Sequence, residues 1–75
     1  MKSIKPRRTV DLVTERLRSD ILTGIYPVGS RLPAERKLSE ELEVNRLTLR
    51  AAISHLEAEG LVVPRHGQGI VVLNY

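Results

Sequence analysis

The sequence contains no cysteine and no long apolar run. Each absence excludes a class of protein. Without cysteine, the 75 residues have no disulfide and no thiolate metal site to support a small core. No run approaches the roughly 20 apolar residues of a membrane helix, and the N-terminus lacks the apolar core of a signal peptide. We therefore expect one small domain in the cytoplasm, without membrane contact.

Acidic residues are missing from the first eight positions, which carry four basic side chains, Lys2, Lys5, Arg7 and Arg8. The other 67 residues hold eight basic and nine acidic side chains. A polyanion-binding surface there would depend on the placement of charges and not on bulk charge. Residues 1–8 are either a solvated terminus or a basic arm that touches phosphates, and the sequence leaves both open.

Apolar periodicity predicts three helices, over residues 9–24, 34–42 and 45–60. Thr9 and Asn45 are the expected N-caps of the first and third helices. Gly24 and Gly60 are the expected residues of positive φ at their ends. Between the first two helices, two prolines and a glycine indicate a connector that has room for a short strand.

The apolar pattern changes after Gly60, where the β-branched runs LVVPR and IVVLNY flank HGQG. This pattern predicts a two-stranded hairpin, and Pro64, which has no N–H to donate, favours an edge position or a strand end. The predicted fold is therefore mainly α with a small β-hairpin: a winged helix-turn-helix in residues 9–75. Its helix-turn-helix covers about 35–54 and its wing about 61–74.

Two arginines, Arg46 and Arg50, stand at the start of the third predicted helix. At roughly 100° per residue, its core face consists of Leu49, Ala52, Ile53 and Leu56, so both arginines point away from the core. The second helix of a helix-turn-helix places its N-terminal residues at base edges in the major groove. Arginine can grip guanine O6 and N7 with two donors, although exposed arginines four apart are often only solvated.

Neighbouring residues support the same reading. The N–H groups of Arg46, Leu47 and Thr48 are expected to be free for a phosphate, and exposed Leu47 could meet a thymine methyl group. The hairpin tip offers Arg65 and His66, with a glycine on each side of Gln68 that allows close approach to a groove. Each feature alone is ordinary helix surface or an ordinary turn, but their occurrence together favours nucleic-acid binding.

No catalytic constellation is recognisable. Glu35, Glu40 and Glu41 are interpreted as a solvated helix face, and His55 and His66 fall on different elements. We therefore expect no enzyme activity, no cofactor and no metal site. The main rival is a winged helix used as a protein-interaction module, whose third helix would present an apolar or mixed surface instead of paired arginines.

Three segments appear in order: ILTGIYPVGSRLPAERKLSEEL, VNRLTLRAAISHLEAEGLV and RHGQGIVV. With them, from about Val10 to Leu73, the chain resembles the N-terminal domain of the GntR family of bacterial transcription regulators. The resemblance implies a winged helix that binds a palindromic operator in double-stranded DNA as a homodimer. Such proteins continue into a C-terminal domain that binds a small-molecule effector. We therefore expect a fragment, monomeric or weakly dimeric, although a natural short form is the alternative.

The resemblance also implies roles for single residues. Arg36 would contact DNA from the second helix, although a pair with Glu40 within that helix is the alternative. Arg46 and Arg50 would grip the major groove, and Thr48 would contact a phosphate.

At the wing, His66 and Gly67 would reach the minor groove. The family usually has Ser or Thr where this chain has Asn45, which caps equally well, and a smaller or polar residue where it has Leu47. The candidate DNA-binding residues are thus Arg36, Asn45, Arg46, Leu47, Thr48, Arg50, His66 and Gly67.

Overall fold

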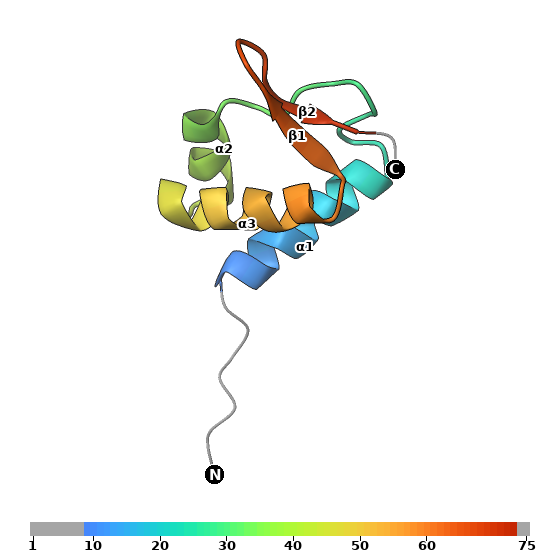
Figure 1. Ribbon diagram of the computed structural model, residues 1–75. Coiled ribbons are helices and arrows are strands. Elements are labelled where there is room, and N and C mark those ends of the chain that lie inside the picture. Colours follow the sequence, from blue (N-terminus) through green and yellow to red (C-terminus); the bar gives the residue numbers. More distant parts are fainter. Residues whose placement is uncertain (1–8, 74–75) are drawn as a thin grey trace.

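Three helices are followed by a two-stranded hairpin in the computed structural model, which describes residues 9–73. The elements are α1 (Thr9–Leu22), α2 (Glu35–Leu42), α3 (Arg46–Ala58), β1 (Val62–Arg65) and β2 (Gly69–Val72). The helix α3 packs against α1, α2 and β1. In Figure 1, α2 and the hairpin lie above α3, and α1 begins below α3 and rises obliquely past it. The predicted winged helix-turn-helix is confirmed.

The first helix buries one narrow stripe. Val13, Leu17 and Ile21, each four residues apart, are at most 7% exposed. After the helix ends, Gly24 takes a φ of 88° and its N–H donates to the carbonyl of Ile21 at 3.2 Å, as expected for the residue that closes a helix. The prediction that Thr9 is the N-cap is wrong, because Thr9 already belongs to α1.

The end of α2 sets the turn of the helix-turn-helix. Leu38 is buried against the core, and the helix stops at Leu42. The next residue, Glu43, takes a left-handed conformation with φ 59° and ψ 44°, and its N–H donates to the carbonyl of Glu40. The N–H of Val44 then donates to the carbonyl of Ser39. One left-handed residue therefore redirects the chain from α2 into α3 within three positions.

The end of α3 is closed by Gly60 as predicted. Gly60 has a φ of 81°, and its N–H donates to the carbonyl of Glu57 at 3.0 Å. The N–H of Leu61 donates to the carbonyl of Leu56, also at 3.0 Å, which completes a Schellman motif. Both leucines are buried, so the motif joins the helix end to the start of the hairpin through the core.

The hairpin forms part of a very small sheet. The strands β1 and β2 pair antiparallel, with Pro64 opposite Ile70. On its other side, β2 makes one bridge, from Val71 to Arg31. The short strand expected in the connector is thus reduced to a single bridge. Within residues 9–73, β1 has no second strand beside it, so Pro64 lies on an edge as predicted.

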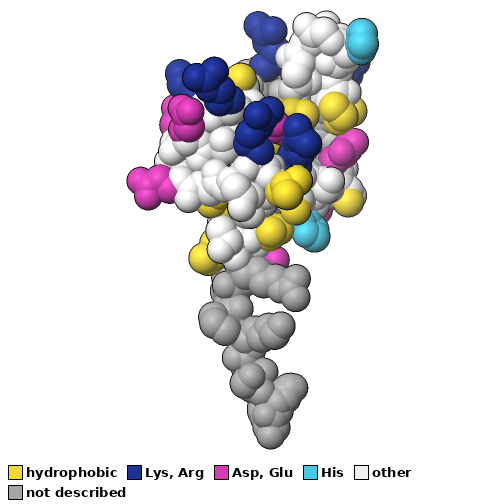
Figure 2. All heavy atoms as spheres, turned by 90° about the vertical axis from the view of Figure 1, so that its left-hand side faces the viewer, with side chains coloured by type: hydrophobic (Ala, Val, Ile, Leu, Met, Phe, Trp, Pro, Cys, Tyr) yellow, Lys and Arg dark blue, Asp and Glu magenta, His cyan; other side chains and the backbone are white. Residues whose placement is uncertain are grey.

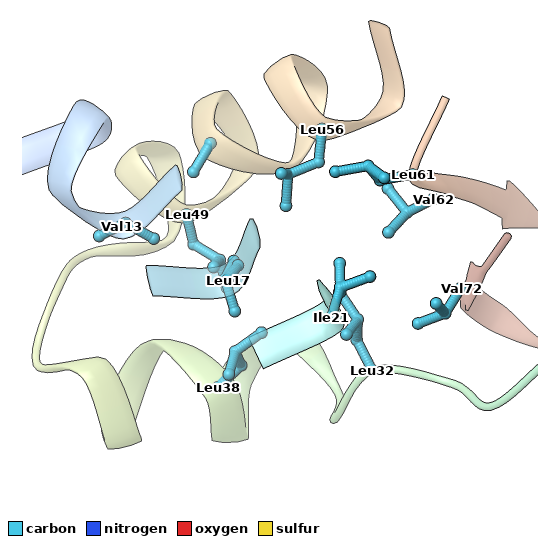
Figure 3. Close-up of a cluster of buried hydrophobic side chains, with 11 residues drawn as sticks. Val13, Leu17, Ile21, Leu32, Leu38, Leu49, Leu56, Leu61, Val62 and Val72 are labelled. Atoms are coloured by element: carbon cyan, nitrogen blue, oxygen red, sulfur yellow. The ribbon is translucent and has the colours of Figure 1, made fainter. Parts of the chain in front are cut away.

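One apolar cluster joins α1, α2, α3 and the hairpin (Figure 3). Its buried members are Val13, Leu17, Ile21, Leu32, Leu38, Leu49, Ala52, Leu56, Leu61, Val62 and Val72. On α3, Leu49, Ala52 and Leu56 are completely buried, which confirms most of the predicted core face. Because this face anchors α3 to the domain, the first turn of α3 can present its other side chains to solvent.

Candidate nucleic-acid interface

Asn45 caps the first turn of α3. Its backbone is extended, with φ −80° and ψ 167°, and its Oδ1 accepts a hydrogen bond from the backbone N–H of Thr48 at 2.8 Å. The cap therefore forms as predicted. It also means that the N–H of Thr48 is already occupied, so the expectation of three free N–H groups in this turn is wrong for that one residue.

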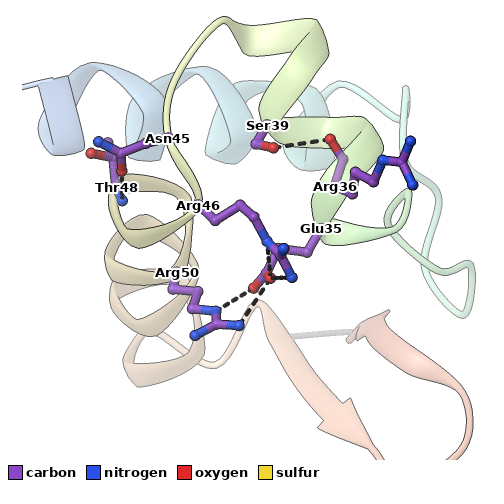
Figure 4. Close-up of polar contacts among 7 residues, drawn as sticks. All are labelled: Glu35, Arg36, Ser39, Asn45, Arg46, Thr48 and Arg50. Atoms are coloured by element: carbon purple, nitrogen blue, oxygen red, sulfur yellow. Dashed lines mark hydrogen bonds and ion pairs between the residues drawn. The ribbon is translucent and has the colours of Figure 1, made fainter.

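The two arginines of α3 are exposed and converge on one carboxylate (Figure 4). Each arginine side chain is 59% exposed. Arg46 approaches Oε1 of Glu35 with Nε at 3.0 Å and Nη2 at 2.9 Å. Arg50 donates from Nε to Oε2 at 2.6 Å and from Nη2 to Oε1 at 3.1 Å. Glu35, the first residue of α2, thus bridges both arginines.

Electrostatics favour this bridge. The hydrogen bond from Arg50 is the largest cause that lowers the pKa of Glu35 below its usual value, and Arg46 adds to the effect. Conversely, Glu35 raises the pKa of the Arg50 guanidinium. The carboxylate is therefore ionised at neutral pH, and it offsets two positive charges that stand unfavourably at the positive end of a helix dipole.

The prediction that Glu35 belongs to a solvated helix face is wrong. It is separated from Arg46 and Arg50 by 11 and 15 positions, so no helical periodicity connects them. Only the way in which α2 crosses α3 places the first residue of one helix beside the first turns of the other. The sequence signal that points to it is indirect: an acid at the start of the second helix of a helix-turn-helix.

Arg36 lies on the neighbouring position of α2 but points away from the arginine pair (Figure 4). Its Nε is 3.7 Å from a carboxylate oxygen of Glu40, so the alternative pair within the helix is present. The side chains remain 83% and 70% exposed, however. A loose pair at the surface contributes little and leaves the guanidinium accessible to a ligand.

Between the arginines, Leu47 and Thr48 differ in accessibility. Leu47 is 75% exposed, the highest value among the large hydrophobic residues that the structure describes as exposed. Thr48 is half-buried. The Leu47 side chain, in the first turn of α3, therefore makes no contribution to the core.

The hairpin tip is a three-residue turn, His66, Gly67 and Gln68. The N–H of Gln68 donates to the carbonyl of Arg65 at 2.9 Å, and Gly67 has a φ of 77°, which side-chain-bearing residues rarely adopt. Figure 1 shows the tip rising away from α3. Its exposed side chains therefore extend the surface of the domain beyond the helix.

A groove extends from Glu35 and Arg50 to the hairpin. Its lining includes Glu35 and Arg50 from the helices, Ile53 further along α3, and Gly69 and Ile70 from β2. The elements that border it carry exposed basic side chains: Arg36 and Lys37 on α2, Arg46 and Arg50 on α3, and Arg65 on β1. Figure 2 shows Lys and Arg side chains gathered in the upper half of this face. On this face, the basic side chains are therefore grouped and not evenly spread.

Other features considered in the sequence do not bear on this surface in the structure. The basic residues 1–8 fall outside the described residues. Within residues 9–73, no helix is long and apolar enough to cross a membrane, and no group of three His, Cys, Asp or Glu side chains is placed to hold a metal ion. An ion pair that was not predicted from the sequence joins Arg18 and Glu59, which lie 41 positions apart.

Comparisons with known proteins agree with this geometry. The Exu regulon transcriptional regulator of Escherichia coli (strain K12) is 42% identical over 74 residues, which cover 99% of this chain and 29% of the relative. The Uxu operon regulator of Haemophilus influenzae is 41% identical over 66 residues, covering 88% of this chain and 25% of the relative. The chain thus spans less than a third of either relative.

A solved structure shows the same fold. AraR(DBD) in complex with operator ORR3 has a TM-score of 0.84 and 29% identity, and the match covers 96% of this chain and 87% of that one. The sequence model of the bacterial regulatory proteins of the gntR family matches residues 9–72. Because this match includes all three helices and the hairpin, the chain belongs to the gntR family of bacterial regulatory proteins.

Proposed function

We propose that this chain is the DNA-binding part of a transcription regulator and binds double-stranded operator DNA sequence-specifically. The observation that carries the proposal is the exposed pair Arg46 and Arg50 on the first turns of α3. In a helix-turn-helix this helix enters the major groove, and its N-terminal residues meet the base edges. Guanidinium groups at that place match the O6 and N7 acceptors of guanine.

The other residues of this turn have supporting roles. Asn45 fixes the start of α3 through its bond to the N–H of Thr48 and so sets where both arginines project. The hydroxyl of Thr48 would contact a phosphate, and exposed Leu47 would offer an apolar contact for a thymine methyl group. Together they would read a short sequence in one half-site.

Flanking contacts come from α2 and the wing. Arg36 is exposed on α2, the helix that crosses the DNA backbone in such complexes. At the wing tip, His66 is exposed and Gly67 carries no side chain, which suits insertion into a minor groove. The AraR complex with its operator supports the assignment of DNA as the ligand of this fold.

The intact regulator would bind a palindromic operator as a homodimer, since two-fold related helices fit two half-sites about one turn of DNA apart. The present chain would be monomeric or weakly dimeric by itself. A small-molecule effector would act through a separate C-terminal domain. We further propose that this domain acts in the cytoplasm, needs no cofactor and catalyses no reaction.

In-vitro selection from a random duplex library with the 75-residue chain tests the function. We expect enrichment of one half-site motif, and an affinity whose logarithm falls linearly with the logarithm of salt concentration. A protein-interaction module would enrich no motif. Absence of enrichment, together with a flat salt dependence, would show that DNA is not the ligand.

A further inference from the structure

The contact between Glu35 and the arginine pair leaves part of each guanidinium available. An arginine side chain has five N–H donors. Glu35 engages Nε and Nη2 of both Arg46 and Arg50. Within the described residues, Nη1 of either arginine makes no hydrogen bond. The carboxylate therefore holds one edge of each fork and leaves the outer end, with Nη1 and the second N–H of Nη2, directed away from it.

That outer end is sufficient to read a base. A guanidinium recognises guanine with two donors directed at O6 and N7. Both arginines can present two donors while they keep their bonds to Glu35, so reading a guanine does not require the bridge to break. The side chains are also held in one arrangement before binding, which reduces the conformational entropy that binding must remove.

Contact with backbone phosphates is different. An arginine that swings toward a phosphate gives up its bonds to Glu35 and leaves an unpaired carboxylate beside a polyanion. Non-specific binding depends on such interchangeable phosphate contacts. The bridge should therefore weaken non-specific binding more than specific binding, because it restricts the arginines to acceptors that lie where their held outer ends point and prevents them from following the backbone freely.

We propose that Glu35 is a positioning residue for sequence recognition, which orients Arg46 and Arg50 toward base edges and opposes their use as free cations on the DNA backbone. The proposal rests on the DNA-binding function proposed above. It assigns a role in a basic surface to an acidic residue, and it predicts a change in the ratio of specific to non-specific affinity.

The chain offers a matched control. Glu40 lies on the same helix and pairs with another arginine of the surface, Arg36, at 3.7 Å, but both side chains are highly exposed and the pair is loose. Glu35→Gln and Glu40→Gln remove the same charge from the same helix. A general effect of net charge should appear in both variants, whereas loss of the bridge should appear only in Glu35→Gln.

The experiment measures affinity by fluorescence anisotropy for two duplexes over a series of salt concentrations. One duplex is the sequence most enriched by the wild-type chain, and the other is a shuffled duplex of the same base composition. For Glu35→Gln we expect tighter binding to the shuffled duplex, a steeper salt dependence there, and a specificity ratio that falls about tenfold. For Glu40→Gln both affinities should rise together with the ratio unchanged.

A third variant, Glu35→Asp, keeps the charge but shortens the side chain that spans both arginines. It should lower the ratio as well, which separates positioning from charge. An unchanged ratio in both Glu35 variants would overturn the proposal. So would a ratio that increases in Glu35→Gln, since that result means that Glu35 only masks the arginines. If the wild-type chain enriches no motif, the proposed function fails instead.

Discussion

Arg18 of α1 and Glu59, the residue after α3, form a two-point ion pair between elements distant in sequence. Nε of Arg18 donates to Oε1 at 2.9 Å, and Nη2 donates to Oε2 of the same carboxylate. The pair lies at the end of α3 opposite to Arg46. It therefore ties the far end of the proposed recognition helix to α1, while the core residues of α3 hold its middle.

This pair predicts a pH-dependent contribution to stability. The hydrogen bond from Arg18 lowers the pKa of Glu59 below its ordinary value of 4.5. For a carboxyl group with a lowered pKa in the folded state, the stabilisation is present above 4.5 and disappears as the pH falls through the lowered value. Glu59→Gln should thus reduce the free energy of unfolding by about 0.5–1 kcal/mol at pH 7, and this loss should shrink as the pH falls below 4.5 through the lowered pKa.

Urea unfolding of both proteins at pH 7, 4 and 2 measures this difference. Glu57→Gln is the control, because it removes the same charge two positions away, at an exposed residue of α3. We expect Glu57→Gln to change stability by less than about 0.5 kcal/mol. An equal loss in both variants, or a loss for Glu59→Gln that does not shrink between pH 7 and pH 2, would contradict the role of the pair.

Substitutions of Arg46 and Arg50 should separate the effect of their positive charge on DNA binding from the effect of their guanidinium geometry. Arg46→Ala or Arg50→Ala should weaken binding to the selected duplex by about 1–3 kcal/mol and relax specificity at one base pair. Arg46→Lys and Arg50→Lys keep the charge but lose the planar fork. Competition binding with single-base variants of the duplex should therefore show a similar loss of specificity in the lysine variants.

The lysine variants are also the control for phosphate contact. They should bind the shuffled duplex with nearly wild-type affinity and salt dependence, because non-specific binding depends on the number of positive charges and not on their geometry. If a lysine variant discriminates between bases as well as the wild-type chain does, the corresponding arginine contacts the backbone and does not read a base.

The fold could be predicted because its determinants are local. The stripe Val13, Leu17 and Ile21 follows helical spacing, Gly60 marks a helix end by its conformational freedom, and Pro64 marks an edge by its missing N–H. These signals depend on a few neighbouring positions. Their physical causes are therefore readable from the chain without knowledge of its tertiary structure.

The site could be predicted only in part. The orientation of Arg46 away from the core followed from periodicity within α3. Its contact with Glu35 did not, because it depends on the crossing of two helices that the sequence does not specify. The ion pair between Arg18 and Glu59 was not predicted for the same reason. Side-chain pairs between elements thus require the packing geometry, even when each element is predicted correctly.

The N-cap of α3 predicts a measurable stability effect with a matched rescue. Asn45→Ala removes the acceptor of the Thr48 N–H and should lower the free energy of unfolding by about 1 kcal/mol. Asn45→Ser keeps an acceptor at the same position and should restore most of the loss. Thermal unfolding of the three proteins measures the effect. Equal stability of the alanine and serine variants would mean that the cap does not stabilise α3.

The turn between α2 and α3 predicts a stabilising substitution. Glu43 has a φ of 59°, and the left-handed conformation costs a residue with a side chain roughly 1–2 kcal/mol. Glycine adopts it without that cost but loses more backbone freedom on folding, about 0.5–1 kcal/mol. Glu43→Gly should therefore raise the free energy of unfolding by about 0.5–1 kcal/mol, which urea unfolding at pH 7 measures.

Glu41→Gly is the control, because the same substitution at this position should lower the free energy of unfolding. Glu41 is exposed and lies within α2, where glycine costs up to about 1 kcal/mol because the helix gains nothing from its conformational freedom. Both variants lose one negative charge near the C-terminal end of α2, so the helix dipole affects them alike. A loss of stability in Glu43→Gly comparable to that in Glu41→Gly would show that Glu43 stabilises the turn through its side chain and that its left-handed backbone carries no strain.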